Sequence, residues 1–142
     1  MRPPTHVVKI EGMEDLQETL KDVLPREATN SLRRTTYGLA GTVAEKMKSR
    51  APKRTGKFVK AIKRKRNRGT KTSIEASVVA ESSKKLPGYR WHWFEFGTKK
   101  MTARPFIVPS VEEIRPSVSG LFRQEFGTQF EREMAKRNKK RK

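Results

Sequence analysis

The sequence predicts an α+β protein in which a small antiparallel sheet is packed by two N-terminal helices and one long C-terminal helix. Two observations predict this class. Apolar residues recur every three or four positions before residue 51 and after residue 110, as in amphipathic helices. Shorter alternating or aromatic runs between them are typical of strands. We expect residues 1–135 to form one domain with a basic arm at 57–72, followed by a disordered basic tail at 136–142.

The N-terminal third is predicted to form a strand and two helices. Residues 6–11 can form a short strand, and apolar residues spaced three and four apart predict a helix over 13–24 that Pro25 ends. A longer helix is expected over 26–50, ending where Ala51 precedes a proline. Its two glycines either weaken it or allow another element to approach closely. One face of this helix carries Ala28, Leu32, Leu39, Ala40, Val43 and Met47.

The next segment combines a short helical turn with a strongly basic stretch. Thr55 is expected to cap a helical turn over 56–62 that buries Phe58 and Ile62. Residues 46–74 contain no acidic side chain, so the basic stretch should be a solvated loop or an extended arm. Its basic residues are candidate contacts to a partner or to DNA: Lys57, Lys60, Lys63, Arg64, Lys65, Arg66, Arg68 and Lys71.

The stretch 89–109 is expected to organise the fold, because it holds both tryptophans and three of the seven phenylalanines. Residues 73–81 alternate apolar and polar side chains and predict a half-buried strand. Residues 89–96 predict a second strand, central in the sheet or at a subunit interface because both its faces are apolar. A turn at Gly97 and Thr98 then leads to a short extended run between two prolines.

The chain is expected to end in a long amphipathic helix. Ser110 can cap this helix, acidic residues follow in its first turn, and Pro116 should kink it near Arg115. The last seven residues include six Lys or Arg and are expected to fray. The apolar stripe of the helix comprises Val118, Leu121, Phe122, Phe126, Phe130 and Met134.

Composition restricts the classes of function. Apolar residues make up 33% of the chain, so the core is small, and the lack of cysteine excludes disulfides and thiolate chemistry. The formal net charge of +19 favours contact with nucleic acid, acidic protein surfaces or an anionic membrane. No apolar run approaches the roughly 20 residues that span a bilayer, and the N-terminus lacks the pattern of a signal peptide. We expect a protein used inside a cell without membrane contact.

No catalytic or ligand-binding pattern accompanies this charge. His6 and His92 lack metal-ligand spacing, and no glycine-rich loop has the spacing that cradles phosphate. His92 lies between two tryptophans and is interpreted as a structural or interface residue. Glu95 lies in an aromatic run where an isolated charge is costly, so we expect it to pair with Arg104 or Lys99. A protein that is not an enzyme and takes no cofactor or metal is expected.

Three short motifs occur in a fixed order. The first is Ala51-Pro52 followed by Thr55-Gly56-Lys57-Phe58 and Ala61-Ile62, the second is Phe94-Glu95-Phe96-Gly97-Thr98, and the third is Arg104-Pro105-Phe106-Ile107-Val108-Pro109. Together they resemble the tail-completion, or neck, protein family of long-tailed bacteriophages, over nearly the whole chain. Two departures are an alanine at 61, where serine is usual, and a heavier basic insert at 63–72.

The resemblance implies a structural protein of the virion neck, present in the host cytoplasm during assembly. Such proteins form rings, commonly sixfold, between the head connector and the tail tube. The expected partners are copies of this chain, head-connector proteins and tail-terminator or tail-tube proteins, with genomic DNA in the channel as a further candidate. The expected interface or structural residues are Thr55, Gly56, Trp91, Trp93, Phe94, Glu95, Phe96, Gly97, Thr98, Arg104, Pro105, Phe106 and Pro109.

A basic nucleic-acid-binding protein is the alternative interpretation. Residues 53–71 contain ten Lys or Arg, and the last seven residues contain six more. Such blocks suit phosphate contacts, but they equally suit a solvated surface or docking on acidic proteins. No zinc-finger spacing or RNA-recognition signature accompanies them. Composition leaves both interpretations open.

Overall fold

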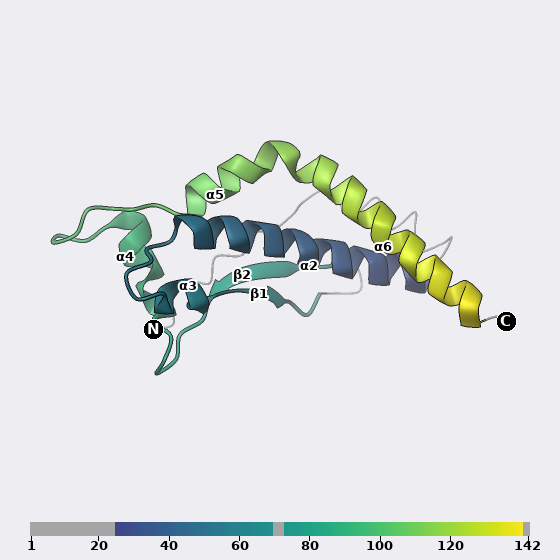
Figure 1. Cartoon of the computed structure of the whole chain (residues 1–142), viewed down its shortest axis with the longest axis horizontal. Coiled ribbons are helices and arrows are strands. Elements are labelled where there is room, and N and C mark those ends of the chain that lie inside the picture. The colour runs from purple at the N-terminus through teal and green to yellow at the C-terminus, as the bar shows by residue number, and fades with distance from the viewer. Residues whose placement is uncertain (1–24, 70–72, 141–142) are drawn as a thin grey trace.

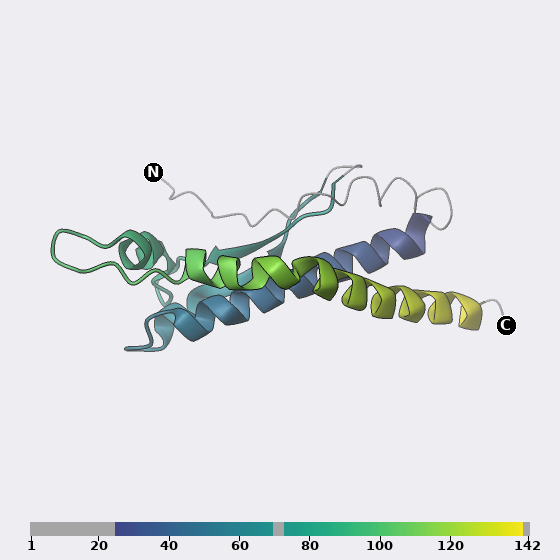
Figure 2. The same cartoon turned by 90° about the horizontal axis from the view of Figure 1, so that it is seen from above.

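The computed structural model describes residues 25–69 and 73–140, which pack around one long helix, α2 (Pro25–Arg50). The two-stranded sheet lies along one side of α2, and the C-terminal helices lie along the other (Figure 1). Seen from above, α6 crosses over α2 at a shallow angle (Figure 2). The strand expected at 6–11 and the helix expected at 13–24 lie outside the described residues.

Helix α2 confirms the longest prediction from the sequence. All six apolar residues of its predicted face are buried, from Ala28 near the start to Met47 near the end. Pro25 is the first residue of α2, where its missing amide leaves no helical hydrogen bond unmade. The helix ends at Arg50, and the following Ala51 amide closes the last turn on the Met47 carbonyl, 2.8 Å away.

The sheet consists of β1 (Ile62–Arg66) and β2 (Ala76–Ala80), which pair antiparallel with Ile62 opposite Ala80. Strand β2 confirms the strand predicted at 73–81. Strand β1 corrects the expectation of a loop or arm, because the backbone pairs despite four consecutive basic side chains. Every second residue of β1 faces α2, and Arg64 lies beside Gly41, where an added Cβ would come within 2.6 Å of its guanidinium. One glycine of α2 therefore allows close approach of the strand.

The predicted second strand at 89–96 is wrong. This segment forms a 3₁₀ turn, η1 (Gly88–Arg90), followed by α4 (Trp91–Phe96). Helical spacing buries Trp91 and Glu95 and exposes Trp93 and Phe96. A short, continuously apolar run fits a strand or a buried helical turn equally well, so its pattern could not separate the two. The fold remains α+β because β1 supplies the second strand.

The C-terminal region contains α5 (Ile107–Ile114), the 3₁₀ turn η2 (Arg115–Ser117) and α6 (Val118–Lys140). The break predicted at Pro116 is confirmed, since this proline lies in η2. Two details are wrong: α5 begins at Ile107, where an extended run was expected, and Ser110 does not cap a helix. Ser110 is buried inside α5 and donates its hydroxyl hydrogen bond to the Phe106 carbonyl.

Helix α6 packs along α2 and carries a half-buried row of aromatic rings. The rings of Phe122, Phe126 and Phe130 stack in sequence, with 5.8 Å between successive ring centroids. The helix continues to Lys140, into the basic stretch that was expected to fray. Cationic side chains in the last turn interact favourably with the negative end of the helix dipole, which favours this extension.

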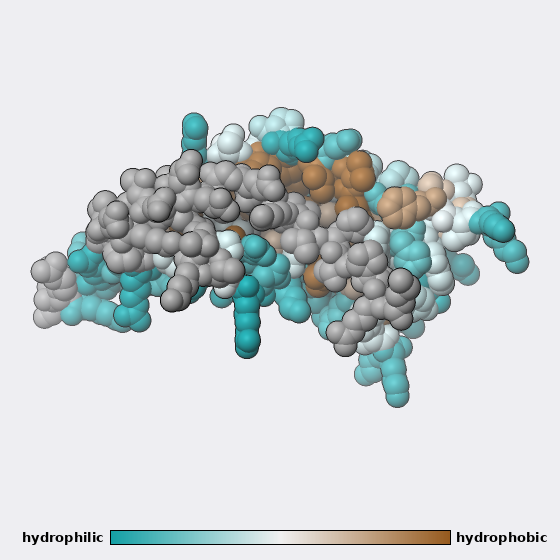
Figure 3. Space-filling model, turned by 180° about the vertical axis from the view of Figure 1, so that it is seen from behind, coloured by the Kyte–Doolittle hydropathy of each residue, from teal (hydrophilic) through white to brown (hydrophobic). Residues whose placement is uncertain are grey.

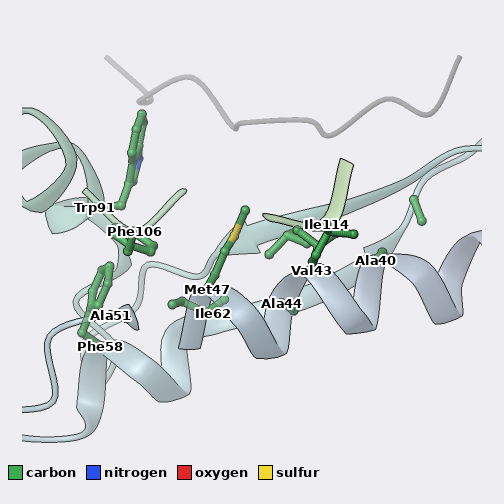
Figure 4. Close-up of a cluster of buried hydrophobic side chains, with 12 residues drawn as sticks. Ala40, Val43, Ala44, Met47, Ala51, Phe58, Ile62, Trp91, Phe106 and Ile114 are labelled. Carbon is green, nitrogen blue, oxygen red and sulfur yellow. The ribbon is translucent and has the colours of Figure 1, made fainter. Parts of the chain in front are cut away.

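The hydrophobic core is a narrow row of side chains between α2 and its neighbours. In Figure 4, Phe58, Trp91 and Phe106 lie at one end of this row, and Val43, Ala40 and Ile114 lie toward the other. Phe106 is the largest side chain that is almost completely buried. The core therefore joins the aromatic segment to the middle of α2.

Glu113 of α5 tethers that helix to α2. Its carboxylate accepts hydrogen bonds from the Lys46 ammonium and from Arg50, whose Nη2 is 2.7 Å from Oε2. These bonds, the one from Arg50 first, lower the pKa of Glu113 to about 2. All three side chains are well exposed, so the tether fixes geometry more than it adds stability.

Because the pKa of Glu113 is depressed in the folded state, its stabilisation is present above the unfolded pKa, near 4.5, and is lost as the pH falls toward about 2. We expect Glu113→Gln to lower the melting temperature slightly at neutral pH, with the difference from wild type vanishing near pH 2. Thermal unfolding followed by circular dichroism across this range measures it. The neighbouring Glu112→Gln is the control, and an equal pH-dependent loss in that variant would contradict the assignment.

Candidate assembly interface

The three motifs singled out in the sequence meet at one end of the core, each contributing a phenylalanine. The ring centroid of Phe58 lies 4.8 Å from that of Phe94 and 5.5 Å from that of Phe106, both in edge-to-face geometry. Such pairs stabilise beyond the area they bury, by about 0.5–1.5 kcal/mol each. Residues 36 and 48 positions apart in the chain are thus fixed relative to one another.

Glu95 joins the second motif to the third, but not through the ion pair that was expected. Its carboxylate accepts three backbone hydrogen bonds at the start of α5, from the amides of Phe106 (2.8 Å), Ile107 (2.9 Å) and Val108 (3.0 Å). The first amides of a helix lack partners within the helix, and the helix dipole favours a negative charge there. Glu95 is therefore a helix cap supplied from α4, and the predicted pairing with Arg104 or Lys99 is wrong.

The turn between α4 and α5 requires glycine at position 97. Gly97 has φ +75° and ψ −179°, a conformation that L side chains rarely adopt. An added Cβ would lie 2.8 Å from the Ala103 amide nitrogen and 2.9 Å from the Met101 carbonyl oxygen. The loop after Gly97 folds back toward α4. Thr98 and Met101 pair through backbone hydrogen bonds, and the Arg104 amide donates a hydrogen bond of 2.7 Å to the Phe94 carbonyl. The predicted turn at Gly97 and Thr98 is confirmed.

The first motif forms the short helix α3 (Lys57–Ala61), which confirms the predicted helical turn and the burial of Phe58 and Ile62. The capping role predicted for Thr55 is wrong, because Gly56 occupies the N-cap position and no side chain caps the helix. Gly56 has φ +67°, a left-handed backbone conformation that favours glycine. An added Cβ would meet no other atom within 4 Å, so lack of space is not the reason for glycine here.

Large apolar side chains remain exposed beside this rigid junction. Phe96 is 69% exposed, Val108 52%, Tyr89 41% and Trp93 39%. We call these four residues the aromatic end, since α4 and its loop lie at one end of the elongated molecule (Figure 1). Tyr89 and Trp93 pack edge to face, with 5.8 Å between their ring centroids. Solvent-exposed aromatic rings in a fixed orientation are typical of protein interfaces.

A cleft of about 600 Å³ lies next to the aromatic end and is lined by residues of all three motifs. Phe58 and Phe94 contribute apolar surface, while Arg54, Arg90 and Arg104 bring positive charge. Among the described residues, no carboxylate lines the cleft. The chemistry of the cleft suits a partner segment that is both apolar and acidic.

The remaining predicted interface residues take different positions around this junction. Trp91 is buried in the core, and His92 is half-buried beside it, with its Nδ1 making no hydrogen bond in the described part of the chain. Pro105 is exposed before α5, and Pro109 lies in the first turn of α5, where its missing amide is harmless.

The described basic residues that were predicted to contact a partner or DNA do not line the cleft. Lys57 and Lys60 are exposed on α3, and the other described members follow β1 and the residues after it. Lys63 forms an ion pair with Glu81. Lys71 lies outside the described residues.

Sequence reasoning missed Arg54 and Arg90 at the cleft and Tyr37 beside β1. Arg90 immediately precedes the aromatic residues of α4 in the sequence, and this position could have indicated that it lies at the cleft. Tyr37 carried no signal, because its role depends on a strand that the sequence did not predict.

Within residues 25–69 and 73–140, no group of three or more His, Asp or Glu side chains could hold a metal ion. None of the helices in the described part of the chain is long and apolar enough to cross a membrane.

A small α+β domain that presents rigid aromatic side chains is typical of a protein that assembles with other proteins. The family comparison gives the class. Residues 14–97, more than half of the chain, match the family described as "Bacteriophage HK97-gp10, putative tail-component". The chain belongs to this HK97 gp10-like family of phage tail components, which confirms the resemblance to tail-completion proteins. Comparisons with curated proteins and with solved structures found no match.

Proposed function

We propose that this protein is a structural component of the phage neck, where copies of the chain form a ring between the head connector and the tail tube. Membership of a phage tail-component family supports the general role. The observation that carries the specific role is the aromatic end, which exposes four large apolar side chains on a rigid support. Such a surface is costly to leave in water and becomes favourable when a neighbour covers it.

The aromatic end is proposed to pack against the next copy in the ring. Glu95 holds α4 to the start of α5, so the exposed rings keep one orientation relative to the core. A fixed orientation matters because ring closure depends on the angle between successive copies. Sixfold closure is the number that the resemblance to neck proteins suggests.

Ring formation is expected to depend on the other parts of the particle. Each copy carries a formal charge of +19, so copies repel one another in dilute solution. An acidic surface on the connector or tail, or the DNA itself, would offset this repulsion. We therefore expect rings to form on the growing particle, with the host cytoplasm as the place of assembly.

A basic nucleic-acid-binding protein remains the second candidate. It is favoured by one observation, the exposed run of basic side chains along β1. If DNA binding were the main role, the protein would act on DNA without other phage components.

Electron microscopy of particles from a phage that lacks this gene tests the proposed function. We expect filled heads beside unattached tails, with normal joining restored when the protein is supplied from a plasmid. Normally joined particles in the absence of the protein would refute the neck role.

A further inference from the structure

The side of β1 that faces α2 carries two arginines held against one aromatic ring. The guanidinium carbon of Arg64 lies 4.1 Å from the centroid of the Tyr37 ring, and that of Arg66 lies 4.6 Å from it. Arg64 also donates a long hydrogen bond, 3.4 Å, to the Tyr37 carbonyl. The absence of a side chain at Gly41 makes room for the Arg64 guanidinium group. Both arginine side chains are exposed to solvent, and their contacts with Tyr37 hold them in place.

Neither arginine forms an ion pair within the described residues, whereas several other basic side chains do. Glu113 holds Lys46 and Arg50, Glu133 holds Arg34 and Lys136, and Glu81 holds Lys63. Because both guanidinium carbons lie within 4.6 Å of the same ring centroid, the two like charges are close enough to repel each other. An anion placed between them or across them would relieve that repulsion.

The arrangement suits a phosphate better than a carboxylate on a folded protein. Other exposed basic residues lie before and after the two arginines along the chain, at Lys57 and Lys60 on α3 and at Arg68 after β1. Hydrophilic side chains also project from the lower edge of the molecule, on the side of the sheet away from α2 (Figures 1 and 3). The planar fork of arginine matches phosphate oxygens, and further cations nearby in the chain add to the attraction of a polyanion.

We propose that the face of β1 formed by Arg64 and Arg66 over Tyr37 binds the phosphodiester backbone of double-stranded DNA. Arg64 and Arg66 make the phosphate contacts, and Tyr37 positions both guanidinium groups. The contact is independent of base sequence. It deepens the proposed function, since the DNA that passes through a neck ring would meet this face, but the site can be tested apart from the ring.

Fluorescence anisotropy with the purified full-length protein and a labelled 30-base-pair duplex tests the site. The double variant R64Q/R66Q should bind about tenfold more weakly at moderate salt, and its salt slope should be shallower by about two, near 0.9 per lost phosphate contact. Tyr37→Leu changes no charge and should also weaken binding while leaving the salt slope nearly unchanged. Thermal unfolding confirms that each variant is folded.

The matched control is R123Q/R132Q, which removes two exposed charges from α6 and lowers the net charge equally. An equal loss in the control would show binding to the overall charge and would overturn the site. Wild-type affinity in R64Q/R66Q would also overturn it, and with failed head–tail joining it would indicate a protein partner. Separated heads and tails in the gene-deleted phage test only the neck role. The proposed DNA contact and the proposed neck role can therefore be refuted independently of each other.

Discussion

Replacing Glu95 with alanine should lower the free energy of unfolding by about 3–5 kcal/mol. The change leaves three amides at the start of α5 without their acceptor, in a region where Phe106 is almost fully buried. It also removes the side-chain link from α4 to the start of α5, so the turn at Gly97 must be held by the backbone hydrogen bond from Arg104 to Phe94 and by the Thr98–Met101 pairing. Urea unfolding followed by circular dichroism measures the loss.

Three further variants separate the helix cap from the ion pair that the sequence suggested. Glu95→Gln keeps the shape and one oxygen acceptor, so we expect an intermediate loss of about 1–3 kcal/mol. Lys99→Ala and Arg104→Ala should change stability by less than about 1 kcal/mol, since neither forms an ion pair with Glu95 in the described residues. A loss in Arg104→Ala equal to that in Glu95→Ala would contradict the capping role.

The double variant W93A/F96S should fold normally and fail to support phage growth. Phe96 is 69% exposed and Trp93 is 39% exposed, so their removal costs the fold less than removal of a buried ring would. At an interface, a buried aromatic residue contributes about 2 kcal/mol or more, and a ring repeats the loss at every contact. We expect the titre of a gene-deleted phage complemented with this variant to fall by more than about 100-fold relative to wild type.

The matched control is Phe130→Ala, which removes a half-buried ring from α6, away from the aromatic end. It should lower stability and retain complementation at a temperature where it is folded. Full complementation by W93A/F96S would contradict the assembly role of the aromatic end.

Long periodic elements could be predicted from the sequence, and short elements fixed by tertiary contacts could not. Helix α2 was predicted almost to the residue, because 26 residues of consistent spacing leave no alternative. Helix α4 has only six residues, and its aromatic composition favours a strand. Its helical form depends on placing Glu95 at the start of α5, a contact that no local pattern records.

The candidate site was predicted in its residues but not in its geometry. The three motifs do converge, yet the partners of Glu95 are backbone amides 11 to 13 residues away, which no side-chain pattern can reveal. Strand β1 was missed because four consecutive basic residues are typical of a loop. An edge strand tolerates them, and exposed charges there also discourage pairing with other chains.

The most direct test of the assembly role is site-specific photo-crosslinking in intact phage particles. A photoreactive residue in place of Phe96 should link the chain to a second copy of itself, with a control at Arg132 on the outer surface of α6 giving little product. Mass spectrometry of the linked product identifies the partner. Crosslinking of position 96 to another copy would confirm that the aromatic end lies between subunits. Particles that contain the protein but give no link at position 96 would contradict the account.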